Sequence, residues 1–242
     1  MIMNPSAIKN VVLDGHSLTL ESFVAVARYG ATVELADSAM EAMKKSRALA
    51  EKIADEGRVA YGITTGFGDF QRVAVSSEMS NQLSTNLILS HCTATGEPYA
   101  EEVVRGMMLL RANALCVGVS GVRPLLVEML IEMLNKGVHP VVPQKGSLGS
   151  SGDLAPLAHM SLPLLGKGEA VYQGVKMSGA EAMESAARRA SPWWPRTCAS
   201  CWRAPRFWTT ARTTACRTPT PCAASPSSTA LCVTPWTMCA TR

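Results

Sequence analysis

This sequence has few aromatic residues and no long hydrophobic run. Aromatic residues make up 5% of its 242 residues, so a core has to be built mainly from the other side chains in its 47% hydrophobic content. No stretch of 18 apolar residues and no signal-peptide pattern occurs, which predicts a soluble, cytoplasmic protein without membrane partners. The length allows one large domain or two small ones.

Lysine, aspartate and glutamate are absent from residues 185–242. This segment holds eight arginines and therefore carries a charge of +8, whereas residues 1–184 carry 15 basic and 19 acidic residues, or −4. It also contains all five tryptophans and six of the eight cysteines, and it shows no hydrophobic period. We therefore expect two parts, an ordered region at 1–184 and a disordered tail at 185–242.

A frameshift would explain the tail. When RTPTPCAA at 217–224 is back-translated and shifted by one base, one choice of codons gives QDSYSLRC. That string resembles a later active-site block of the family named below, so we expect this chain to be truncated relative to that family. Coding DNA without an alternative frame downstream of the Ala186 codon would contradict this hypothesis.

The tail also prompts a different hypothesis, a module that binds zinc or nucleic acid. Cys198 and Cys201 are spaced as C-x2-C, and arginines surround them. Structural zinc sites of this type need a second pair of ligands, and no matching second pair follows. We therefore expect no metal site and no nucleic-acid partner.

Residues 1–184 show repeated helical patterns, which predict a mainly α fold. Short strands are expected at 11–13 and as a hairpin around Gln173-Gly174. Ser38 and Glu41 have the spacing of a capping box, in which each residue bonds a free backbone N–H of the other. Apolar residues at helical spacing predict helices at about 19–29, 38–57, 78–94, 101–117, 122–136 and from Asp153 to before Gly166.

Two arginines of the predicted helix at 101–117 are candidates for ion pairs. Arg105 and Arg111 can reach Glu101, Glu102 or another subunit. We expect ordinary surface pairs, because most such arginines are solvated.

Residues 149–153, Gly-Ser-Ser-Gly-Asp, can form an electrophile from their own backbone. Gly152 lacks a Cβ, so its amide nitrogen can approach the carbonyl carbon of Ser150 through backbone angles that are costly for other residues. Loss of the Ser151 hydroxyl would then leave 4-methylideneimidazole-5-one (MIO). By itself, Ser-Ser-Gly-Asp is also a common turn or helix N-cap.

Three blocks together resemble the aromatic amino acid ammonia-lyases. They are YGITTGFG at 61–68, NLILSH at 86–91 and GSLGSSGDLAPLAHM at 146–160, in family order. The resemblance runs from about Val11 to Glu184 and implies the N-terminal part of the multi-helix ammonia-lyase fold, which is like that of fumarase and aspartase. The usual family triplet is Ala-Ser-Gly. Ser150 replaces the alanine here, but it contributes only its carbonyl to the ring, so the ring should still form.

The resemblance implies a mechanism without a metal or diffusible cofactor. MIO would form autocatalytically from Ser150, Ser151 and Gly152, and Tyr61 would remove the β-proton of the amino acid substrate. A phenol has an ordinary pKa of about 10, so a tyrosine base needs positive potential nearby. Without the resemblance, a tyrosine before a glycine-rich turn would be a packing residue. A homotetramer is implied, with each active site combining residues from three chains.

The substrate side implied by the resemblance consists of Gly68, Ser90 and His91. Histidine-specific members carry Ser-His at the second position, phenylalanine-specific members Phe-Leu and tyrosine-specific members His-Leu. We therefore expect elimination of ammonia from L-histidine to give trans-urocanate. By its spacing from Leu87 alone, His91 could equally be a hydrogen-bonded core histidine. The alternatives are a phenylalanine or tyrosine lyase or aminomutase, and a non-catalytic partner of full-length lyase chains.

Overall fold

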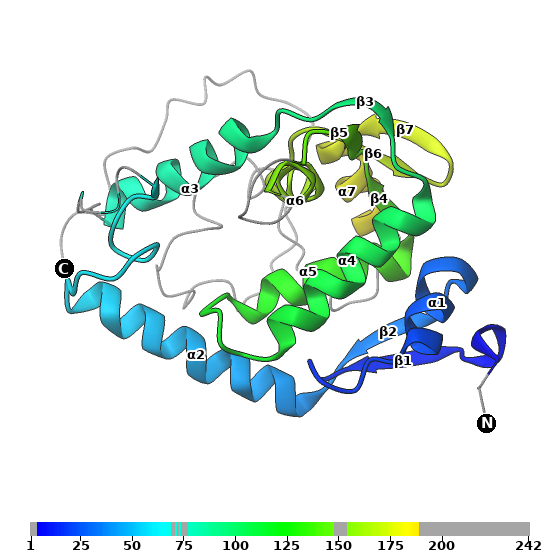
Figure 1. The fold of residues 1–242 in the computed structure, drawn as a ribbon, viewed down its shortest axis with the longest axis horizontal. Coiled ribbons are helices and arrows are strands. Elements are labelled where there is room, and N and C mark those ends of the chain that lie inside the picture. The colour runs from blue at the N-terminus through cyan, green and yellow to red at the C-terminus, as the bar shows by residue number, and fades with distance from the viewer. Residues whose placement is uncertain (1–3, 69–70, 72, 74–76, 148–153, 189–242) are drawn as a thin grey trace, which may run out of the picture. The chain divides into compact units, whose positions relative to one another are not determined.

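The structure is a computed structural model that describes residues 4–68, 71, 73, 77–147 and 154–188. Seven α-helices and two short 3-10 helices (η1 and η3) are found in these ranges, so the predicted mainly α class is confirmed (Figure 1). The helices are η1 Pro5–Ala7, α1 Leu20–Tyr29, α2 Asp37–Asp55, α3 Ser77–His91, α4 Glu101–Cys116, α5 Pro124–Lys136, α6 Leu154–Ser161, η3 Pro163–Leu165 and α7 Gly179–Arg188.

The strands of the described residues form three small sheets. The first is a parallel pair, the second an antiparallel pair and the third an antiparallel sheet of three strands in the order β4-β6-β7. The strands are β1 Asn10–Leu13, β2 Thr32–Leu35, β3 Thr95–Pro98, β4 Val138–Pro140, β5 Pro143–Lys145, β6 Glu169–Tyr172 and β7 Val175–Ser178.

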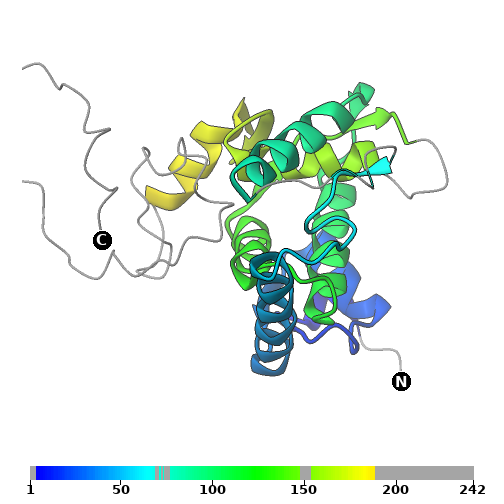
Figure 2. The same cartoon turned by 90° about the vertical axis from the view of Figure 1, so that its left-hand side faces the viewer.

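Helices α4 and α5 lie side by side and carry much of the core (Figures 1 and 2). Both bury apolar residues along most of their length, and α1 packs against α4 while β2 packs against α5. The fully buried side chains there are almost all aliphatic or methionine, as the scarcity of aromatic residues required. They include Val104, Met108, Leu109, Val127, Leu130, Met133 and Leu134.

The cap at the start of α2 differs from the sequence prediction. The predicted Ser38–Glu41 capping box is wrong, because the N-cap is Ala36 and has no side-chain cap bond. The Ala36 N–H donates to the carbonyl of Leu13 at 3.0 Å, which fixes where the chain leaves β2 and starts α2 one residue before Ser38. Glu41 instead accepts from Lys44 Nζ at 2.8 Å. Tertiary pairing of β1 with β2 therefore decides where α2 begins.

A capping box is present at the start of α7. The Glu181 N–H donates to Ser178 Oγ at 3.3 Å, and Glu181 Oε2 accepts from the Ser178 N–H at 3.2 Å. The preceding hairpin is the one that the sequence predicted. Gln173 and Gly174 have φ values of 52° and 77°, the pair of positive angles that a two-residue type I′ turn requires.

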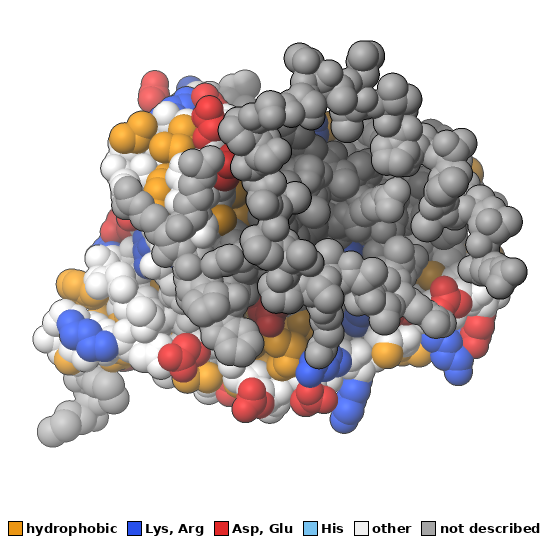
Figure 3. All heavy atoms as spheres, turned by 180° about the vertical axis from the view of Figure 1, so that it is seen from behind, with side chains coloured by type: hydrophobic (Ala, Val, Ile, Leu, Met, Phe, Trp, Pro, Cys, Tyr) orange, Lys and Arg blue, Asp and Glu red, His pale blue; other side chains and the backbone are white. Residues whose placement is uncertain are grey.

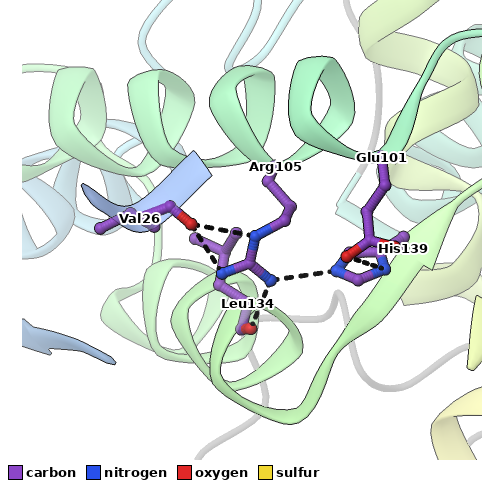
Figure 4. Close-up of polar contacts among 5 residues, drawn as sticks. All are labelled: Val26, Glu101, Arg105, Leu134 and His139. Carbon is purple, nitrogen blue, oxygen red and sulfur yellow. Dashed lines mark hydrogen bonds and ion pairs between the residues drawn. The ribbon is translucent and has the colours of Figure 1, made fainter. Parts of the chain in front are cut away.

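The guanidinium of Arg105 is buried in the core (Figure 4). Its Nε and Nη2 donate to the carbonyl of Val26 at 3.0 and 2.9 Å, and Nη1 donates to the carbonyl of Leu134 at 3.1 Å. Val26 lies in the last turn of α1, where carbonyls lack their usual intrahelical partner, and the Leu134 carbonyl near the end of α5 also accepts from the Gly137 N–H at 3.3 Å. Arg105 therefore caps the C-terminal ends of α1 and α5 at once.

Nη1 of Arg105 also donates to His139 Nε2 at 3.1 Å. A guanidinium can only donate, so Nε2 must be the unprotonated nitrogen and the neutral ring carries its proton on Nδ1. That nitrogen faces Glu101 Oε1 at 3.6 Å (Figure 4). Burial lowers the pKa of His139, the positive charge of Arg105 lowers it further, and Glu101 opposes both.

The predicted surface pairing of Arg105 is therefore wrong. Glu102 pairs with Arg28 at 2.8 Å across an exposed contact, whereas the Arg105 side chain is buried. The reason is the packing of α4 between α1 and α5, which makes position 105 an interior position.

On the face drawn in Figure 3, acidic and basic side chains of the described residues are interspersed. Within the described ranges, none of the helices is long and apolar enough to cross a bilayer.

Replacing Arg105 with methionine is expected to lower the free energy of unfolding by about 3 kcal/mol, because the Val26 carbonyl and His139 Nε2 lose their donors inside the core, while the Leu134 carbonyl keeps the Gly137 N–H. The measurement is urea unfolding of the purified chain. Arg28→Met is the control, since its pair with Glu102 is exposed and contributes about 0.5 kcal/mol. Equal effects of the two variants would contradict the assigned role.

Acid is expected to destabilise the fold through His139. The pKa of this imidazole is 6.5 in the unfolded chain and lower when folded, so below pH 6.5 the unfolded chain binds a proton that the folded chain does not. The free energy of unfolding should therefore fall as the pH drops from 7 to 5. His139→Gln should reduce that slope, which urea midpoints measured at several pH values would show. An unchanged slope in His139→Gln would contradict this assignment.

Candidate functional site

The loop that follows α2 is shaped by two threonines that the sequence analysis did not single out. The N–H of Ala60 donates to Thr64 Oγ1 at 2.9 Å, and the N–H of Gly62 donates to Thr65 Oγ1 at 3.3 Å. Thr65 is 3% exposed, and its own hydroxyl donates to the carbonyl of Gly66 at 3.1 Å. The loop is thus a hydrogen-bonded unit, which the glycine spacing alone did not reveal.

Tyr61 and Gly68, two of the predicted site residues, are brought together in this loop. The N–H of Gly68 donates to the Tyr61 hydroxyl oxygen at 3.5 Å, the outer limit of a hydrogen bond. The Tyr61 ring packs edge-on against Phe67, with 5.9 Å between centroids and 72° between planes. Its side chain is 64% exposed, so the hydroxyl is available to a ligand.

Gly62 and Gly68 have positive φ values of 76° and 58°. A Cβ on Gly62 would lie 3.3 Å from the Phe67 ring, so a side chain there would press on the residue that supports Tyr61. The two glycines thus allow the chain to turn back and bring the Gly68 N–H under the phenol.

Ser90 and His91, the other predicted pair, lie at the C-terminal end of α3. Ser90 Oγ donates to the carbonyl of Leu87 at 2.8 Å, and His91 Nδ1 lies 2.8 Å from the same oxygen. Because that carbonyl can only accept, Nδ1 carries the proton in the neutral ring and Nε2 is left as an acceptor. His91 is half-buried and Ser90 exposed, so the pair is anchored by the helix backbone at a partly open position.

The neighbouring thiol does not compete as a nucleophile. Cys92 Sγ donates to the carbonyl of Ile88 at 3.1 Å, and burial raises the pKa of this thiol.

No hydrogen bond of the described residues joins Tyr61 or Gly68 to Ser90 or His91. Within the described residues, the predicted site residues therefore form two separate pairs, Tyr61 with Gly68 and Ser90 with His91.

The predicted ring-forming triplet, Ser150, Ser151 and Gly152, lies outside the described residues, as does the Cys198–Cys201 pair. The chain on either side of the triplet is described. On the N-terminal side β5 pairs with β3, in the register Thr95 with Lys145. On the C-terminal side α6 begins at Leu154 and packs against α3, the helix that ends in His91. Within the described ranges, no three His, Cys, Asp or Glu side chains are grouped as a metal site.

A family model described as aromatic amino acid lyase matches residues 18–193. The histidine ammonia-lyase of Alkaliphilus metalliredigens (strain QYMF) is 56% identical over 179 residues, which are 74% of this chain and 35% of that protein. The chain thus spans about a third of the length of the curated relatives that it matches.

Two solved structures are similar to this chain. The ergothionase of Treponema denticola matches with a TM-score of 0.70 and 32% identity, over 73% of this chain and 35% of that one. The phenylalanine aminomutase of Pantoea agglomerans matches with a TM-score of 0.68 and 36% identity, over 73% and 33%. Since these two proteins are named for different reactions, the fold alone does not select a substrate.

Replacing the buried Thr65 with valine is expected to loosen the loop around Tyr61, because the Gly62 N–H and the Gly66 carbonyl both lose their partner. Hydrogen exchange at the Gly62 amide should become about tenfold faster, equivalent to about 1.4 kcal/mol of local stability. Ile63→Val, at an exposed side chain of the same loop, serves as the control. Unchanged exchange in Thr65→Val would show that the hydroxyl does not hold the loop.

Proposed function

The chain belongs to the aromatic amino acid lyase family, and from this premise we propose that it carries the electrophile and part of the substrate site of a histidine ammonia-lyase. The reaction is elimination of ammonia from L-histidine to give trans-urocanate. The observation that carries the proposal is the Ser-Ser-Gly triplet at 150–152, which lies in the sequence between β5, paired with β3, and α6, packed against α3.

We propose that the triplet closes into MIO by forming a bond from the Gly152 nitrogen to the Ser150 carbonyl carbon. One water takes the Ser150 oxygen with the amide hydrogens of Ser151 and Gly152. A second takes the Ser151 hydroxyl with its Cα hydrogen. The ring supplies an electrophilic carbon that activates the amino acid substrate for loss of its amine. The N–H groups of Leu154 and Ala155, in the first turn of α6, lack intrahelical partners, so the positive end of this helix begins two residues after Gly152 in the sequence.

Tyr61 is the proposed base for the β-proton of the substrate. Its hydroxyl oxygen accepts from the Gly68 N–H at 3.5 Å, so the phenol is oriented by its own loop. The side chain is exposed, and the loop beneath it is held by Thr64 and Thr65. These contacts would keep the oxygen in place while it takes the proton.

His91 is the proposed contact for an imidazole substrate. The carbonyl of Leu87 holds the proton of the neutral ring on Nδ1, so Nε2 can accept a hydrogen bond from an imidazole N–H. A phenylalanine ring has no such donor and would leave Nε2 unpaired. Ser90 Oγ, 3.0 Å from His91 Nδ1, restrains the same ring. This chemistry favours histidine over phenylalanine.

A homotetramer is proposed with the same function, because family members complete each active site with residues from neighbouring chains. The chain spans about a third of its relatives' length, which favours a second candidate function as a non-catalytic partner of longer lyase chains. Turnover of L-histidine by the purified chain alone would exclude the second candidate. Co-purification with an active longer lyase, and no turnover alone, would favour it.

Ring formation can be tested without any activity. The tryptic peptide that spans 148–153 is expected to be lighter than its sequence by two waters, about 36 Da. Ser151→Ala should abolish the loss of 36 Da, because the second water cannot leave, and at most one water, about 18 Da, should then be missing. Ser150→Ala is the matched control and should keep the loss, since this position supplies only a carbonyl. A fully hydrated peptide from folded wild-type protein would overturn the proposed function.

A further inference from the structure

The chain that leaves the C-terminal end of α3 is fixed within three residues of His91. The N–H of Cys92 donates to the carbonyl of Leu89 at 3.3 Å, and the N–H of Thr93 donates to the carbonyl of His91 at 2.9 Å. The next residue, Ala94, is partly buried and lies just before β3. Because only two residues separate Ala94 from His91, a contact that holds Ala94 also limits how far the end of α3 can move.

His159 of α6 supplies such a contact. The N–H of Ala94 donates to His159 Nε2 at 3.2 Å. A backbone N–H can only donate, so Nε2 must be unprotonated, and the neutral ring carries its proton on Nδ1. Burial lowers the pKa of His159, which favours this neutral form. The bond joins residues 65 positions apart, so no local pattern of the sequence indicated it.

A second distant residue, Gly146, packs directly against Ala94. A Cβ on Gly146 would lie 2.6 Å from both the Cα and the Cβ of Ala94, a distance that real Cβ atoms do not reach. Gly146 follows β5, which pairs with β3. Ala94 is therefore held by a side-chain acceptor from α6 and by close contact with the residue after β5.

The position of His91 depends on how α3 lies against α6, the helix that carries His159 (Figure 1). Packing of side chains alone fixes the angle between two helices only to within about 20°. The Leu87 carbonyl holds the His91 imidazole to the backbone of its own helix, so the ring moves with the end of α3. A shift of α3 against α6 would therefore move His91 Nε2, the nitrogen proposed to accept from an imidazole substrate.

We propose that His159 is a positioning residue for His91, acting through its hydrogen bond to Ala94. The bond keeps the end of α3 in one place against α6, so His91 Nε2 has one direction before a ligand binds. Without the bond, the end of α3 would sample several placements, and the affinity for imidazole would fall with the fraction that remains competent. This inference rests on the proposed function, in which His91 contacts an imidazole substrate. His159 acts on that contact only through Ala94.

The test uses free imidazole as the probe and the purified full chain at pH 8. The chain has four histidines, so 15N labelling of histidine gives few ring signals, which single variants assign. In wild type the His91 ring should carry its proton on Nδ1, and added imidazole should shift its signal. His159→Leu is expected to weaken imidazole binding about tenfold, the loss that follows when one molecule in ten keeps the competent placement.

Three further variants complete the comparison. His159→Gln should restore binding, since Gln Oε1 can accept the Ala94 N–H. His16→Leu, at an exposed histidine in another loop, should bind imidazole as wild type does. His91→Leu should abolish binding, which shows that the probe reports on this ring. Circular dichroism and urea midpoints show whether each variant is folded.

Should His159→Leu fail to fold, Gly146→Ala tests the same anchor, because its Cβ would displace Ala94 while His159 is kept, and imidazole binding should again weaken. Equal binding in wild type and either folded variant would overturn the positioning role and leave the proposed function standing. Weak binding in folded His159→Gln would overturn the acceptor role. Wild type that does not bind imidazole at His91 would overturn the proposed substrate contact, and this inference with it, whereas peptide mass tests ring formation separately.

Discussion

A single buried charge, the guanidinium of Arg105, is the interaction on which the packing of the described helices depends. Taking a charge out of water is costly unless every donor is paired, and Arg105 is paired by carbonyls from α1 and α5 and by a ring nitrogen from β4. These partners are available only when the three elements meet α4 in one arrangement. The pairing therefore selects that arrangement among the many that would bury the same aliphatic side chains.

The same contact lies at the start of the chain segment that leads to residues 148–153. His139 is in β4, and three residues later the carbonyl of Val142 accepts from the Tyr99 N–H at 2.8 Å, just beyond β3. β5 then pairs with β3, and Gly146 contacts Ala94. A continuous series of backbone contacts thus connects the charged core of α4 to the flank of the triplet.

The family and the helical fold could be predicted from sequence because both leave local signals. Three separated blocks were enough for the resemblance, and the family match over residues 18–193 confirms it. The helix at 101–117 was predicted to within one residue of α4, because its apolar spacing and Gly118 are local. The cap of α2 was not predicted, because its N-cap residue Ala36 is held by Leu13, more than twenty residues away. The roles of Tyr61, Gly68, Ser90 and His91 remain predictions.

The sequence by itself determined the family and where most helices run, since motif blocks and a helical period are properties of neighbouring residues. Only the tertiary structure decided that Arg105 lies inside rather than on the surface, that Thr65 holds the Tyr61 loop, and that Gly146 and His159 both meet Ala94. The physical reason is that a side chain's partners depend on which elements pack beside it. Those elements come from distant parts of the chain, where no local pattern reports them.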